Sequence, residues 1–93
     1  MNHRELISRQ LDLFAEDEGD LLAEVYELRE RYNRADRDEA EEAYGDYADA
    51  VESVKETLAD MRDAFAATLD DAEEYERAFE AAARKRWRWL DDG

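Results

Sequence analysis

Residues 44–72 have the sequence YGDYADAVESVKETLADMRDAFAATLDDA, the most regular apolar pattern in the chain. Apolar or small side chains recur there in alternating steps of three and four residues, the period of helices that pack along a seam. The phase continues without a slip through Tyr44, Tyr47, Val51, Val54, Leu58, Met61, Phe65, Thr68, Ala72, Tyr75, Phe79 and Ala82. This stripe predicts one amphipathic helix over residues 36–90, about 80 Å long at a rise of 1.5 Å per residue.

A break near residue 70 is the alternative for this segment. The run Thr68-Leu69-Asp70-Asp71 interrupts the alanine-rich background, and Asp70 with Glu73 has the spacing of a helix-capping pair. A chain reversal there would produce a three-helix bundle. The unbroken phase of the stripe favours the single helix.

A second apolar stripe precedes this segment. It contains Ile7, Leu11, Phe14, Glu18, Leu21, Val25, Leu28 and Tyr32, again in steps of four and three. Asn2 with Glu5 has capping-box spacing, so a helix over residues 3–32 is predicted. Gly19 follows the polar stripe position Glu18, which predicts a weak point or kink there; two helices broken at Gly19-Asp20 are the alternative.

The two stripes are joined by a predicted turn at residues 33–36. Asn33 can adopt the left-handed conformation that ends a helix, and Asp36 with Glu39 has capping-box spacing for the next one. The fold class that follows is all-α: a long antiparallel, coiled-coil-like helical hairpin forming a single domain over residues 1–93.

The two predicted helices differ in length, and this difference predicts a dimer. The first helix spans about 45 Å, so about half of the second would be uncovered. That half carries Tyr75, Phe79, Trp87, Trp89 and Leu90, and an exposed stripe of this size favours association. Pairing of two chains into a helical bundle would cover it.

Acidic residues dominate the composition, with 28 Asp and Glu, 13 Lys and Arg, and a net charge of −15. Only Lys55 and Lys85 are lysines, and the other basic residues are arginines. A disordered acidic segment would have fewer apolar residues than the 44% found here and would lack the regular stripes. The alternative is a folded protein adapted to molar salt, where a Debye length of about 3 Å screens self-repulsion. In these features the chain resembles small acidic helical proteins of halophilic archaea; the resemblance is compositional and implies no particular family.

Most kinds of catalytic and metal site lack their residues here. The chain has no cysteine and one histidine, His3, which is predicted to be solvated beside the N-terminus without a catalytic partner. Its three glycines are too far apart for a phosphate-binding loop. Glu18 is the only carboxylate on the stripes, whereas a metal site in a helical bundle needs several. We therefore predict no cofactor, no metal, no small-molecule substrate and no enzymatic activity.

The hydropathy pattern predicts a cytoplasmic protein that does not contact a membrane. The first residues lack the basic start and apolar run of a signal peptide. The longest apolar runs contain only a few residues, whereas about 20 are needed to span a bilayer.

The most individual feature is a basic and aromatic cluster near the C-terminus: Arg84, Lys85, Arg86, Trp87, Arg88 and Trp89. Arginine and tryptophan are frequent where proteins bind protein partners or nucleic acid, which makes the cluster a candidate docking site. Alternatively, the basic residues complement a helix C-terminus while the tryptophans close the end of the bundle. The net charge of −15 argues against nucleic acid as a partner.

The sequence thus predicts a non-enzymatic protein–protein interaction module, an adaptor, accessory subunit or regulator of a salt-adapted organism. A homodimer and an unidentified protein partner are the expected associations. A nucleic-acid-associated protein that uses the C-terminal cluster is the alternative. The tyrosines are expected to lie in the core with their hydroxyls at its edge. These are Tyr26, Tyr32, Tyr44, Tyr47 and Tyr75.

Overall fold

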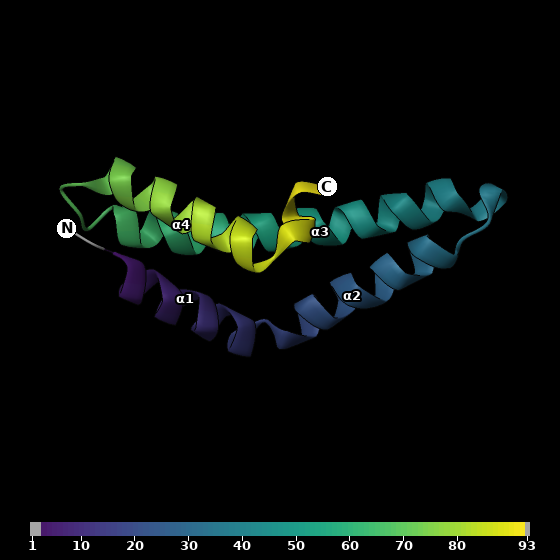
Figure 1. The fold of residues 1–93 in the computed structure, drawn as a ribbon, viewed down its shortest axis with the longest axis horizontal. Helices are drawn as coiled ribbons and strands as arrows, with labels where there is room; N and C mark the ends of the chain where they lie inside the picture. Colours follow the sequence, from purple (N-terminus) through teal and green to yellow (C-terminus); the bar gives the residue numbers. More distant parts are fainter. Residues whose placement is uncertain (1–2, 93) are drawn as a thin grey trace.

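The computed structural model describes residues 3–92, and every regular element in that range is helical (Figure 1). It contains α1 (Arg4–Asp17), α2 (Gly19–Arg34), α3 (Arg37–Ala66), α4 (Ala72–Arg86) and a short 3-10 helix, η1 (Arg88–Asp92). The all-α prediction is therefore confirmed. The helices form a rod of 51 × 22 × 19 Å, and α3 runs along most of its length.

Helices α2 and α3 pack antiparallel, so the predicted hairpin is present between them (Figure 1). The side chain of Asp36 accepts a hydrogen bond from the Glu39 amide at 3.1 Å, which confirms the predicted helix start. The predicted left-handed Asn33 is wrong, because Asn33 lies within α2 and no residue among 3–92 has a positive φ. The extended backbone of Ala35 (φ −66°, ψ 140°) ends α2 instead.

The N-terminal segment bends at Glu18, one residue before the predicted weak point. Glu18 has φ −108° and ψ 29°, so the predicted continuous helix is divided into two, as in the alternative. Hydrogen bonds continue across the bend: the Glu18 amide donates to the Phe14 carbonyl at 2.8 Å, and the Leu22 amide donates to the Glu18 carbonyl at 3.0 Å. Beyond the bend, Leu22 is buried and the predicted stripe residue Leu21 only partly so. The predicted cap Asn2 lies outside the described residues.

The predicted single helix over residues 36–90 is wrong, because α3 ends at Ala66 and the chain reverses before α4 (Figure 1). Local hydrogen bonds form the turn, among them one from a side chain and one from a backbone amide. The Thr68 hydroxyl donates to the Phe65 carbonyl at 2.7 Å, and the Leu69 amide donates to the Ala66 carbonyl at 3.0 Å. The alternative break near residue 70 is the correct one for this half of the chain.

Helix α4 folds back along the second half of α3 and also packs against α1. Helix α4 carries the apolar side chains that the hairpin prediction left exposed. Two of them, Tyr75 and Phe79, are buried within one chain. The length mismatch that led to the predicted homodimer is therefore absent. The oligomeric state remains a prediction.

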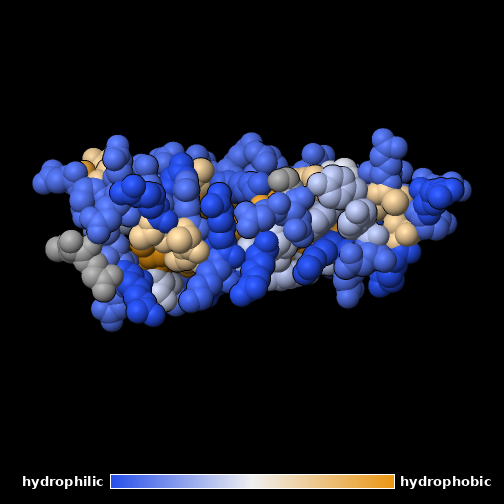
Figure 2. Space-filling model, turned by 45° about the horizontal axis from the view of Figure 1, so that its top comes forward, coloured by the Kyte–Doolittle hydropathy of each residue, from blue (hydrophilic) through white to orange (hydrophobic). Residues whose placement is uncertain are grey.

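One hydrophobic core runs through the rod. Its largest fully buried side chains are Tyr47, Tyr75, Phe14, Phe79, Ile7, Val25, Val51 and Val54, all members of the two predicted stripes. The predicted core position is wrong for Tyr26, Tyr32 and Tyr44, whose exposed fractions are 47%, 37% and 41%. The face shown in Figure 2 is mostly hydrophilic, with apolar side chains visible only in small separate areas.

Candidate functional site

The C-terminal cluster predicted as a docking site is divided between core and surface. Trp87 and Trp89 are only 6% and 5% exposed, because α4 ends at Arg86 and η1 turns back onto the helices. The Trp87 ring centroid lies 5.5 Å from that of Phe14, and the Trp89 centroid lies 6.1 Å from that of Tyr26. The tryptophans therefore pack where α1, α2 and the end of α4 meet, and they present little surface to a partner.

Two basic side chains of the cluster make ion pairs at the surface. Arg84 Nε lies 3.4 Å from Asp91 Oδ1, and Arg86 Nη2 lies 2.6 Å from Asp12 Oδ1. The Arg86 guanidinium also lies 5.2 Å from the Trp87 ring centroid, within cation–π range. These contacts attach α4 to η1 and to α1. Exposed pairs of this kind contribute about 0–1 kcal/mol each.

Lys85 and Arg88 are the other two basic residues of the cluster. Both are exposed, and neither makes an ion pair within residues 3–92. Nucleic-acid sites of this type usually combine cations with aromatic faces on which bases stack. Here Trp87 and Trp89 lie in the core, so the two cations are separated from the aromatic surface that such binding uses.

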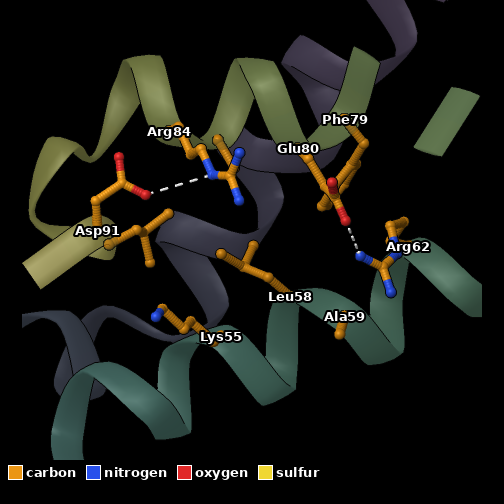
Figure 3. Close-up of a pocket in the computed structure, with 10 residues that line it drawn as sticks. Lys55, Leu58, Ala59, Arg62, Phe79, Glu80, Arg84 and Asp91 are labelled. Atoms are coloured by element: carbon orange, nitrogen blue, oxygen red, sulfur yellow. Dashed lines mark hydrogen bonds and ion pairs between the residues drawn. The ribbon is translucent and has the colours of Figure 1, made fainter. Parts of the chain in front are cut away.

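A pocket opens between α3 and α4 (Figure 3). Its lining includes three large apolar side chains: Leu58 from α3, Phe79 from α4 and Leu90 from η1. Its volume is about 280 Å³, just below the lower limit of about 300 Å³ for ordinary small-molecule sites. Lys55, Arg62 and five other residues complete the lining. The pocket is large enough for one apolar side chain of a partner.

Ion pairs within the chain compensate the arginines of this pocket (Figure 3). Arg62 on α3 binds Glu80 on α4, and its Nε lies 2.8 Å from Asp63 Oδ1. The hydrogen bond that Arg62 donates to Asp63 raises the pKa of Arg62 above its ordinary value. The Arg84–Asp91 pair lies on the other side of the opening. An external anion would therefore compete with the chain's own carboxylates for these cations.

His3 is buried, so its predicted solvated position is wrong. It is 6% exposed, its Nε2 lies 2.8 Å from Asp71 Oδ2, and its ring meets the Tyr75 ring edge-on at 5.5 Å. The hydrogen bond lowers the pKa of the Asp71 carboxyl below its ordinary value. Burial raises the pKa of Tyr75, whose hydroxyl donates to Gln10 Oε1 at 2.7 Å. These contacts join the start of α1 to the turn before α4.

The arm, defined as residues 19–54, contains α2 and the first part of α3. One face of it carries the tyrosine groove, with a volume of about 320 Å³. The groove is lined by Arg29, Tyr32, Asn33, Tyr44, Tyr47 and Asp92. The Tyr44 hydroxyl donates to the Asp92 carbonyl at 2.9 Å, and the Tyr47 hydroxyl donates to Asp92 Oδ2 at 3.0 Å. Burial, assisted by the bond to Asp92, raises the pKa of Tyr47 to about 12. The C-terminal segment thus already covers part of this face.

The other face of the arm carries the acidic groove, with a volume of about 360 Å³. It is lined by Leu21, Glu24, Leu28, Asp46, Asp49, Ala50 and Ser53. Tyr44 and Asp46 point about 200° apart around α3, so the two grooves lie on opposite sides of the arm. Arg31 Nη1 lies 2.9 Å from Asp46 Oδ2. Glu24 and Asp49 have no ion-pair partner within residues 3–92.

Comparison with known proteins identifies no relative: no family model, curated protein or solved structure matches the chain. Over residues 3–92, no helix is long and apolar enough to cross a membrane. Over the same range, no three histidine or carboxylate side chains are grouped so that they could hold a metal ion. The surfaces of this chain are therefore the basis for assigning a function.

Proposed function

We propose that this protein is a non-enzymatic protein–protein interaction module of a salt-adapted organism, and that its arm is the part that engages the partner. It would act as an adaptor, an accessory subunit or a regulator. The three-helix end of the rod, built from α1, α4 and the second half of α3, would serve as a stable base for the arm.

The observation that carries this proposal is the incomplete packing of the arm. Leu21 and Leu28 are only partly buried although they belong to the apolar stripe of α2. Tyr26, Tyr32 and Tyr44 are 37–47% exposed on the same pair of helices. Tyrosine is enriched at protein interfaces because its ring supplies contact area and its hydroxyl can still reach water or a polar group. The arm thus combines half-exposed apolar and aromatic side chains along both of its grooves.

The C-terminal cluster gives less support to the alternative, a nucleic-acid-associated protein. Its tryptophans are buried, and Arg84 and Arg86 are paired with carboxylates. The field of a chain with a net charge of −15 also repels phosphate backbones. Lys85 and Arg88 are the cations on which this alternative depends.

Capture of a tagged chain from its own host at native salt, with and without nuclease, tests the proposal. We expect a stoichiometric protein partner that resists nuclease. The arm variant Leu21→Ser/Leu28→Ser should lose this partner. The control Leu13→Ser, which changes an exposed leucine of α1, should retain it, as should Lys85→Gln/Arg88→Gln.

Circular dichroism of each variant at the same salt establishes that the helices are intact. Recovery of nucleic acid that disappears with Lys85→Gln/Arg88→Gln would favour the alternative. A protein partner that is lost with this charge variant and retained by the arm variant would show that the arm is not the interaction surface.

A further inference from the structure

We infer that the acidic groove of the arm binds a basic amphipathic helix of a partner protein, which packs along α2 and α3 as a third helix. This inference rests on the proposed function and deepens it, because it names the surface and the chemistry of the partner. It is argued from the apolar side chains in the groove, its acidic edges and its position beside α2 and α3.

Apolar side chains, Leu21, Leu28 and Ala50, form part of the groove lining between its acidic residues. Leu21 and Leu28 on α2 are separated by two helical turns, as are Asp46 and Ser53 on α3, so the groove is about 10 Å long. Ala50 lies between the last two and lets a neighbouring backbone approach closely. An amphipathic helix of three or four turns can place its apolar side chains over such a lining at steps of three and four residues.

At the other end of the rod, a helix of this chain already packs against the side of α3. Along its second half α3 packs against α4, which in turn packs against α1, and Phe79 of α4 is 2% exposed. Along its first half α3 packs against α2, and η1 lies against it near the tyrosine groove. The acidic groove is on the opposite side. A helix placed in it would complete the same kind of packing that α4 completes at the other end.

The charge of the groove selects a basic partner. Glu24 stands on one edge and Asp46 and Asp49 on the other, and only Asp46 has a cation, Arg31, within ion-pair distance in the described chain. The whole arm has twelve carboxylates and four arginines, a net charge of −8. Lysine or arginine beside the apolar stripe of a partner helix would lie opposite these carboxylates, which favours correct pairing because partly buried charge pairs are screened less by salt than exposed ones.

The same charge argues against two other occupants. A second copy of the chain would bring a second arm of net charge −8 against the first. A nucleic acid would bring phosphates against uncompensated carboxylates. The pocket between α3 and α4 differs in this respect, because the chain's own acids already pair with both of its arginines.

Two labelled helical peptides with the same leucine positions test the inference, one with lysines and one with glutamates beside the leucines. Fluorescence anisotropy measures their affinity for the full chain at the lowest salt that preserves its helicity. We expect the lysine peptide to bind at least about tenfold more tightly. Hydrogen exchange should show protection of residues 21–28 and 46–53 on binding.

Charge variants locate the effect in the groove without removing core side chains. Glu24→Gln/Asp49→Asn should weaken binding of the lysine peptide about fivefold or more. The control Glu16→Gln/Asp17→Asn makes the same change in net charge on exposed residues of α1 and should change the affinity less than about twofold. Leu28→Ser should weaken binding at low and at high salt, because the apolar contact is not screened.

Equal affinity for the two peptides, or an equal loss in the groove variant and the control, would overturn the inference. So would a wild-type dimer that Leu28→Ser dissociates in sedimentation, because the occupant would then be a second copy. A captured protein partner that is lost with Leu21→Ser/Leu28→Ser but insensitive to Glu24→Gln/Asp49→Asn would refute the inference and leave the proposed function standing. Peptide binding in the groove with no protein partner captured from the host would refute the proposed function and support the groove's chemistry.

Discussion

The two ends of the rod share α3 but differ in the number of helices that pack around it. At one end α4 lies on α3 and α1 lies on α4, so that Phe14, Tyr75 and Phe79 are at most 2% exposed. At the other end α2 alone forms the second helix, and Leu21 and Leu28 remain partly exposed. Partly buried stripe residues occur at both ends, since Met61 and Phe65 beside α4 belong to the same class as Leu21 and Leu28. The arm differs in having one second helix and in exposing Tyr26, Tyr32 and Tyr44 by 37–47%. Under the proposed function, the three-helix end is the base and the arm is the part that gains burial by binding a partner.

Removal of salt should produce the largest difference in stability between the two regions. The arm has a net charge of −8 in 36 residues, and the other 57 residues have −7. The Debye length grows from about 3 Å at 1 M salt to about 30 Å at 0.01 M, so repulsion among the carboxylates increases. We expect helicity measured by circular dichroism to fall as salt is removed, and amide exchange in α2 and the first half of α3 to accelerate before exchange in α4. Full helicity in dilute buffer would refute salt adaptation, and earlier exchange in α4 would contradict the proposed difference between the ends.

The next largest effect should come from replacing one buried leucine with alanine in each region. Leu58, beneath α4 and η1, is 5% exposed, and Leu22 on α2 is 7% exposed. We expect Leu58→Ala to lower the free energy of unfolding by about 4 kcal/mol and Leu22→Ala by about 2 kcal/mol, because the thinner arm can relax around a cavity. Denaturant titration measures both. The control Leu13→Ala, at a 54% exposed position, should change stability by less than about 0.5 kcal/mol. The reverse order of the two buried sites would mean that the arm is the better packed region.

A smaller effect of high pH is expected at the contact between the arm and η1. The pKa of Tyr47 is raised to about 12, above the ordinary value of about 10, by burial and by the hydrogen bond to Asp92. Its contribution to stability is therefore fully present below pH of about 10 and is lost as the pH rises toward 12. Tyrosinate absorbance of the wild type minus that of Tyr47→Phe isolates this titration. Asp92→Asn should lower the pKa of Tyr47 while burial keeps it raised; titration of wild-type Tyr47 near pH 10 would show that η1 does not pack on the arm.

The smallest effect is expected at the three-helix end in acid. The hydrogen bond from His3 lowers the pKa of the Asp71 carboxyl, so this contact contributes stability that is present above the ordinary carboxyl pKa. The contribution is lost as the pH falls through the lowered value. His3→Phe keeps a ring against Tyr75 and removes the donor, so an NMR titration should find the pKa of Asp71 raised toward its ordinary range. An unchanged pKa would show that His3 does not hold Asp71.

The sequence predicted most of the two apolar stripes and the helix start at Asp36 correctly, because both depend on residues close together in the chain. Helical periodicity identifies Val51, Val54 and Leu58 as one face of a helix whatever packs against it. Asp36 caps the amide of Glu39 three residues away, so this contact is local as well. Such features need no knowledge of the rest of the fold.

The sequence favours one long helix over a reversal at residues 67–71, because the apolar stripe keeps its phase across these residues. Tyr75 and Phe79 continue the spacing of Phe65 and Thr68, yet they belong to a helix that runs in the opposite direction. A stripe on a reversed helix still faces the core, so phase alone cannot distinguish one long helix from two antiparallel ones. The aspartates and Thr68 were the only local signal of the turn.

The candidate sites depended even more on tertiary contacts. The C-terminal cluster was conspicuous in sequence, but η1 carries Trp89 to Tyr26 and leaves only the cations outside. The acidic groove had no motif, because Leu21 and Leu28 look like ordinary members of a core stripe. Their partial exposure depends on how α2 packs on α3, and no local motif encodes that packing.

The sequence by itself determined the helical class, the amphipathic faces and the acidic surface, because propensity, periodicity and charge are properties of neighbouring residues. The tertiary structure alone decided where α4 lies, which aromatic rings are buried and which face of the arm is left open. Those outcomes depend on contacts between residues far apart in the chain, such as His3 with Asp71, 68 positions away. Their energies are set by packing in space, and a linear pattern does not contain them.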